Sequence, residues 1–158
     1  MKKSYSFFLT FFIFIFSMPS LAQDNNPRHI RFKEMKLNFI LDNLELTPQE
    51  EEHFHCIFNT YEDEYHSKVW TKERQIKKQV EESFDTIKSQ SASKYITEYH
   101  ELEKLGLTIK NERNQKMLNK IRTKEVLNFL WQEQRFDQEM FKRIRDRDKK
   151  KEVKKKKE

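Results

Sequence analysis

The side chains that could do chemistry in this 158-residue chain are few, and their spacing argues against a metal site. The five histidines are His29, His53, His55, His66 and His100. On a helix, His53 and His55 diverge by about 200° and cannot share a metal. Glu62 and His66, four residues apart, could share one. If the chain folds back near residue 90, His66 faces a position near Asn114 and meets no second histidine. We therefore expect solvated histidines, with no metal and no other cofactor.

Catalytic motifs are also missing from the sequence. It contains no G-x-S-x-G, H-E-x-x-H, C-x-x-C or glycine-rich phosphate loop. Its single glycine, Gly106, leaves little of the tight loop structure on which active sites are usually built. We expect no enzymatic activity.

The lone cysteine, Cys56, excludes a disulfide within one monomer. Two interpretations remain. A buried thiol that packs as a small hydrophobic group is the one we favour, because Cys56 lies beside a long apolar stripe. The other is a disulfide between two chains.

The N-terminus has the pattern of a secretory signal peptide. Lys2 and Lys3 precede an apolar run at 7–16, and Ser20 and Ala22 provide small residues for cleavage. The run is short for a membrane span, which needs about 20 apolar residues. We expect cleavage after Ala22 and a periplasmic protein that does not span the membrane once processed; an uncleaved anchor is the alternative.

Charge is unevenly distributed along the expected mature chain. Between Lys142 and Glu158 there are 11 basic and 4 acidic residues, whereas residues 23–141 carry a net charge of −3. The overall basicity therefore belongs to the tail, and we expect no nucleic-acid partner. The low apolar content, 35% for the whole chain, predicts either a thin, extended molecule or a core completed by dimerisation.

Helices are the only regular elements that the sequence indicates. No proline and only one glycine follow Gln49, whereas sheet proteins need frequent turn residues. Apolar spacing predicts helices over 28–43, 47–87, 95–121 and 123–147, with a turn at 89–93. Thr123 is the expected cap of the last helix. We expect three parts: a signal peptide at 1–22, a helical domain at 23–148 and a lysine-rich disordered tail at 149–158.

The second predicted helix has a strong start signal. Thr47 suits the N-cap, Pro48 suits the first helical position, and Glu50 completes a capping box. Leu46, just before the cap, is expected to pack across onto the first helix. This motif is therefore interpreted as structural.

Two features of the helices predict a surface for a partner. Trp70 departs by about 100° from the apolar stripe of its helix. The last helix is apolar over more than half its circumference, so we expect it to have two neighbours. Trp70, Phe129 and Phe136 are the candidate partner-facing residues. The alternative is that they fill a dimer interface or pack under the first helix.

The segment Leu46-Thr47-Pro48-Gln49-Glu50 resembles the L-T-x-x-Q signature of the Spy/CpxP family of periplasmic proteins, with Glu50 in the place of the final Gln. The run at 54–62 is similar to a divergent branch of that family, as is the basic segment at 136–147. The resemblance implies an all-α, four-helix hooked hairpin that forms a curved, cradle-like homodimer.

The same resemblance implies the function. The first expectation is an envelope-stress protein that binds unfolded or misfolded envelope proteins without ATP. The second is a regulator that binds a membrane sensor kinase or an anti-sigma factor. A metal-responsive sensor is the third, and the histidine spacing disfavours it. A client-binding protein suppresses the aggregation of unrelated proteins, whereas a regulator binds one partner.

Overall fold

The computed structural model describes residues 26–155, and within them every regular element is helical. The expected all-α class is confirmed. The predicted signal peptide at 1–22 lies outside the described residues. In chain order the elements are α1 (Pro27–Leu41), α2 (Pro48–Tyr65), the π-helical turn η1 (His66–Trp70), α3 (Thr71–Ser83), the 3₁₀ turn η2 (Phe84–Thr86), α4 (Ser89–Leu118) and α5 (Thr123–Lys155).

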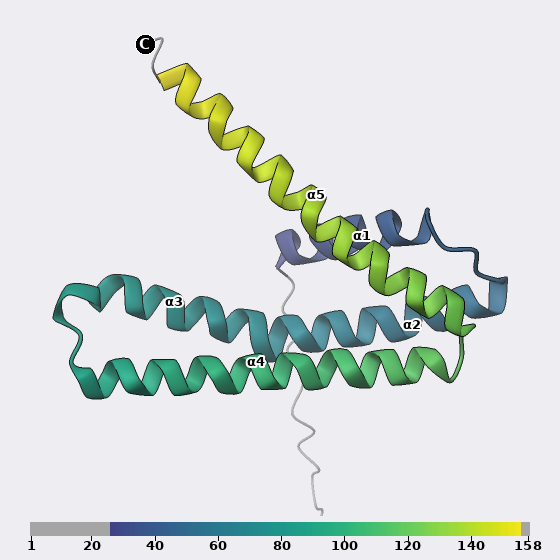
Figure 1. Cartoon of the computed structure of the whole chain (residues 1–158), viewed down its shortest axis with the longest axis horizontal. Coiled ribbons are helices and arrows are strands. Elements are labelled where there is room, and N and C mark those ends of the chain that lie inside the picture. The colour runs from purple at the N-terminus through teal and green to yellow at the C-terminus, as the bar shows by residue number, and fades with distance from the viewer. Residues whose placement is uncertain (1–25, 156–158) are drawn as a thin grey trace, which may run out of the picture.

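Two long helical segments run side by side. In Figure 1, α2, η1 and α3 follow one another as a rod, and α4 returns beside it in the opposite direction. Helices α1 and α5 contact each other, with α1 on α2 and α5 on α4; the first part of α5 lies over the α2 part of the rod, and its C-terminal part projects away from the rod. Residues 71–101, which comprise α3, the reversal and the first part of α4, extend beyond α1 and α5, and we call them the arm. The predicted homodimer stays a prediction.

The start of α2 confirms the predicted cap. Thr47 Oγ1 accepts from the Glu50 backbone N–H at 3.3 Å, and Glu50 Oε2 accepts from the Thr47 N–H at 2.9 Å. Glu50 also accepts from the backbone N–H and the Nε of Arg122, both at 2.9 Å. Leu46 packs against the main core, which includes Leu37 of α1. The motif thus ties the start of α2 to the connection between α4 and α5.

The main core lies where α1, α2, α4 and α5 meet. Phe54 and Phe58 stack at 5.6 Å, and Phe129 meets Phe54 edge-on at 5.4 Å. The other members of this core are Leu37, Ile40, Met117, Ile121 and Val126.

The interpretation of Phe129 and Phe136 as partner-facing residues is wrong. Their side chains are only 1% and 2% exposed. Phe136 meets Phe32 of α1 edge-on at 5.4 Å, with Phe39 close by. The physical reason is that α5 packs against α1 and α4, which buries Phe136 against rings of α1 and turns Phe129 inward onto the rings of α2. Several other apolar positions of α5 are exposed, among them Leu127, Leu130, Trp131 and Phe141.

The predicted single helix over 47–87 is divided by η1. The Thr71 backbone N–H reaches back five residues to the His66 carbonyl, and the Thr71 hydroxyl donates to the same oxygen at 2.9 Å. Such a turn inserts one residue and rotates everything that follows. Val69 is thereby fully buried, while Trp70 turns outward.

Gly106 lies inside α4 and has a packing role there. A Cβ at this position would lie 3.0 Å from Cε2 of Tyr65 and 3.6 Å from Cγ1 of Val69. The helix continues through Gly106 without interruption. The absence of a side chain therefore lets α4 approach α2 and η1 closely.

Three predicted boundaries shift. The serine-rich segment at 89–93 is not the turn, because it forms the first residues of α4; the chain reverses at Ile87 and Lys88, which are both extended. Helix α5 has Thr123 as its first helical residue, one position inside the expected cap. The expected disordered tail at 149–158 begins within α5, which continues to Lys155.

Candidate functional site

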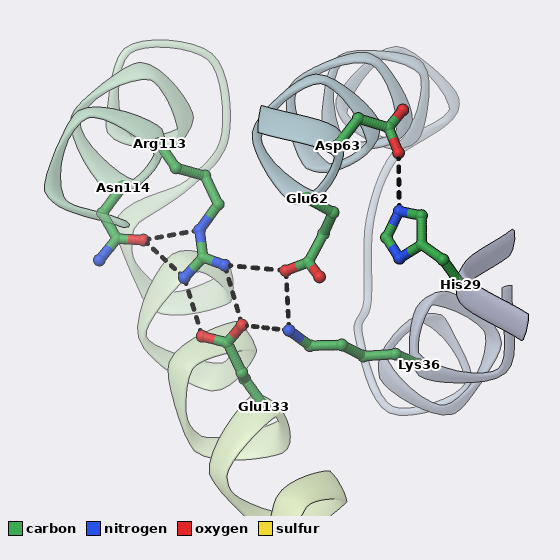
Figure 2. Close-up of polar contacts among 7 residues, drawn as sticks. All are labelled: His29, Lys36, Glu62, Asp63, Arg113, Asn114 and Glu133. Atoms are coloured by element: carbon green, nitrogen blue, oxygen red, sulfur yellow. Dashed lines mark hydrogen bonds and ion pairs between the residues drawn. The ribbon is translucent and has the colours of Figure 1, made fainter. Parts of the chain in front are cut away.

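A buried ion-pair network joins one residue from each of α1, α2, α4 and α5. Lys36 Nζ lies 2.7 Å from Glu62 Oε1 and 2.7 Å from Glu133 Oε1. Both terminal nitrogens of Arg113 donate to the two oxygens of Glu133 at 2.8 Å (Figure 2). Arg113 is 3% exposed. The network holds the four helices in register.

The charges of this network are mutually stabilised. Burial alone raises the pKa of the Glu133 carboxyl, but the hydrogen bond from Arg113 and the charges of Lys36 and Arg113 hold that pKa at about 2. Burial likewise lowers the pKa of Lys36, and the neighbouring Glu133 and Glu62 reverse this, so that it is raised. Lys36 and Glu133 are therefore both charged at neutral pH. Removing one partner would leave an uncompensated buried charge.

A column of stacked rings lies beside the network. The rings of His29 and His66 stack with centroids 3.5 Å apart, and those of His66 and Trp70 with centroids 4.9 Å apart. The Arg74 guanidinium lies 5.4 Å from the centroid of the Trp70 ring. His29 Nε2 lies 3.1 Å from Asp63 Oδ1. The column combines α1 with η1 and α3.

The expectation that no second histidine meets His66 is wrong. Folding back near residue 90 determines only which residues of α2, α3 and α4 face each other. His29 belongs to α1, which lies outside that hairpin and packs across it. Among residues 26–155, no group of three or more His, Cys, Asp or Glu side chains could hold a metal ion.

The network and the ring column border a pocket of about 510 Å³, which we call the inner pocket. Its walls come from α1, α2, η1, α3, α4 and α5. The lining is largely aromatic and charged: Asn26, Arg28, His29, Phe32, Lys36, Tyr61, Glu62, Tyr65, His66, Trp70, Arg74, Ile109, Lys110, Arg113, Glu133 and Asp137. A pocket of this volume suits a small organic molecule.

A second hollow, of about 1020 Å³, lies along the arm between α3 and α4, and we call it the arm groove. Its apolar lining consists of Trp70, Ile76, Val80, Phe84, Tyr95, Ile96 and Tyr99. Phe84 is 69% exposed and Ile96 is 59% exposed. No residue of the arm is buried. The arm therefore presents an apolar face that the described chain does not cover.

Trp70 lies where the two hollows meet. It is 42% exposed and lines both the inner pocket and the arm groove. Its outward position agrees with its departure from the stripe, and its role with a partner stays a prediction. Cys56 is exposed, so its expected burial is wrong: it lies on the outer face of α2, away from Phe54 and Phe58.

The sequence reasoning missed the ion-pair network, although a signal for it exists. Arg113 lies four residues from both Ile109 and Met117, on the buried stripe of α4. Glu133 holds the corresponding place between Phe129 and Phe136 on α5. A charged residue on an apolar stripe predicts a buried partner of opposite charge.

No protein-family model matches the chain, and no similar protein was found among curated proteins or solved structures. The resemblance to the Spy/CpxP family therefore stays a prediction. Within residues 26–155, the structure contains no helix that is long and apolar enough to cross a membrane.

Proposed function

We propose that this protein binds unfolded or misfolded polypeptides without ATP, and that the arm groove receives them. The observation that supports this is the exposure of large apolar side chains on both walls of the groove, with Phe84 from the α3 side and Ile96 and Tyr99 from α4. Uncovered apolar area of this kind is typical of a binding surface rather than of a finished monomer.

The charges of the arm favour binding of many different unfolded polypeptides over binding of one folded partner. Lys77 pairs with Glu81 at 3.8 Å, and Lys78 pairs with Glu82 at 3.7 Å. Pairs this exposed are weak and exchange easily with the charges of an incoming chain. A short apolar contact flanked by both signs of charge would hold an extended segment weakly and release it without an energy source.

The proposal also covers where the protein acts and how it assembles. The Spy/CpxP resemblance and the signal-peptide pattern support a periplasmic protein that acts in envelope stress. A homodimer is also proposed, because Leu127, Leu130 and Trp131 form an exposed ridge on α5. Light scattering on the chain from Gln23 tests the dimer, and a monomer at micromolar concentration would contradict it.

The second candidate function is a regulator that binds one membrane sensor kinase or anti-sigma factor. The same ridge on α5 favours it, because Leu127 and Trp131 at i and i+4 suit a single matching groove.

Aggregation assays on two unrelated denatured proteins distinguish these functions. The chain from Gln23 should suppress aggregation at near-stoichiometric amounts. Phe84→Ser with Ile96→Ser, and separately Trp70→Ser, should weaken suppression while helicity by circular dichroism is unchanged. The matched control, Leu107→Ser with Phe141→Ser, removes two exposed apolar side chains that line neither hollow and should retain it. Suppression lost only in the control, or absent from the parent protein, would contradict the arm as the client site.

A further inference from the structure

The inner pocket has cations that are held in no ion pair of the described residues, although the carboxylate of Asp137 in the same lining attracts Lys110. Arg28, Arg74 and Lys110 all line it, and none forms an ion pair within residues 26–155. By contrast, Lys36 and Arg113 in the same lining are bound to Glu62 and Glu133. The lining contains five Lys and Arg side chains against three carboxylates, which leaves a net charge of +2 with the histidines neutral.

Two of these cations are already held against aromatic faces. The Arg74 guanidinium lies 5.4 Å from the centroid of the Trp70 ring, and Lys110 Nζ lies 5.1 Å from that of Tyr65. They come from different helices, Arg74 from α3 and Lys110 from α4. Ring and cation together can contact both parts of a ligand that has a flat body and a negative group.

The floor of the pocket is fixed in advance. The network of Lys36, Glu62, Arg113 and Glu133 ties four helices together beneath it, and the His29–His66–Trp70 column forms one wall. The π-helical turn aims Trp70 toward this side of the rod. Such turns occur often at functional sites.

We propose that the inner pocket binds a small organic anion that carries an aromatic ring, such as an aromatic carboxylate or sulfonate. The volume of about 510 Å³ is that of a site for a drug-sized molecule. A cationic ligand would meet the net positive lining. A neutral ligand would desolvate Arg74 and Lys110 without giving them a partner. An inorganic anion would leave the aromatic walls uncovered.

The test uses two probes that differ by one charge. 1-Anilinonaphthalene-8-sulfonate is an aromatic anion, and N-phenyl-1-naphthylamine has the same ring system without the sulfonate. Both are titrated by fluorescence into the Phe84→Ser/Ile96→Ser chain, in which the arm groove is weakened. This background also separates the two proposals, because client binding and probe binding can fail independently.

We expect one sulfonate probe per chain, bound at least tenfold more tightly than the uncharged probe. Arg74→Gln with Lys110→Gln should weaken the sulfonate at least tenfold and leave the uncharged probe within twofold. The matched control is Lys72→Gln with Lys116→Gln, which removes two charges from the same helices outside the pocket and should change neither affinity.

Equal affinity for the two probes in the chain that retains Arg74 and Lys110 would overturn the proposal. This comparison remains valid even if the Arg74→Gln/Lys110→Gln chain does not fold. An equal loss in the pocket variant and the control would also overturn it, since binding would then follow overall charge.

Discussion

At the scale of single residues, the packing of the four helices depends on charged side chains that are buried among apolar ones. Arg113 and Glu133 lie on apolar stripes, where an unpaired charge would be very costly. Their two parallel hydrogen bonds of 2.8 Å make the pair specific in geometry. Burying an ion pair costs about as much free energy in desolvation as the attraction between the charges returns. The main effect of the network is therefore to fix how the four helices align, and its net contribution to stability is small.

Removing one carboxylate tests this account. Glu133→Gln leaves the buried charges of Arg113 and Lys36 with Glu62 alone, and it should lower the free energy of unfolding by about 3–5 kcal/mol. Urea denaturation followed by circular dichroism measures the change. The matched control is Glu139→Gln, an exposed position six residues further along α5, which should shift the midpoint little. Equal midpoints for the two variants would contradict the network's structural role.

The pH dependence of stability follows from the same carboxylates. The pKa of Glu133 is held at about 2, well below its ordinary 4.5, and so is that of Glu50 through its hydrogen bonds with Arg122 and the Thr47 backbone. Between these values the unfolded chain binds more protons than the folded one. Stability should therefore be fully present above about pH 4.5 and should fall as the pH decreases toward 2.

Urea midpoints measured from pH 7 to pH 2 check this dependence. The Glu133→Gln chain should show a shallower fall than its parent, because one of the two shifted carboxyls is gone. If the urea midpoint falls equally steeply in both chains, groups other than Glu133 cause the loss of stability at low pH.

At the scale of elements, the sequence predicted what depends on local rules. The capping box at Thr47 and Glu50 needs only a short segment and the residue types that suit it, and the structure confirms it. The division of the long helix at η1 and the pairing of His29 with His66 could not be predicted. The pairing depends on how α1 packs across α2, a contact between segments more than 30 residues apart, and η1 packs against α4, which is also distant in the sequence.

The same contrast explains the two aromatic predictions. Trp70 was identified by its angle on one helix, which is a local property, and it is exposed. Phe129 and Phe136 were identified by an excess of apolar width on α5. The width of an apolar face does not determine which of its positions contact neighbouring helices. Two rings that are buried were therefore predicted to be exposed.

The cap gives a prediction at this scale. Thr47→Ala removes the acceptor of the Glu50 N–H and should cost about 0.5–2 kcal/mol of stability while sparing client binding at temperatures where the fold survives. Thermal melting checks it. Thr60→Ala is the matched control, because its hydroxyl only donates to the Cys56 carbonyl within α2. Unchanged melting with lost binding would instead make Thr47 a contact residue.

At the scale of the whole molecule, the fold divides into a fixed part and an uncovered part. Buried aromatic rings and the ion-pair network join α1, α2, α4 and α5, whereas the arm at 71–101 has no buried residue (Figure 1). Segments with few buried contacts open most readily and are used for binding. The proposed client site is therefore the part of the chain that stability requires least.

Hydrogen exchange measured with and without an unfolded client is the most direct test of this central claim. The chain from Gln23 is mixed with a permanently unfolded, reduced protein, and backbone protection is followed by mass spectrometry. The account predicts added protection within 71–101, and none within the exposed first half of α5 that carries Leu127 and Trp131. Protection confined to α5, or no protection of the arm at saturating client, would contradict it.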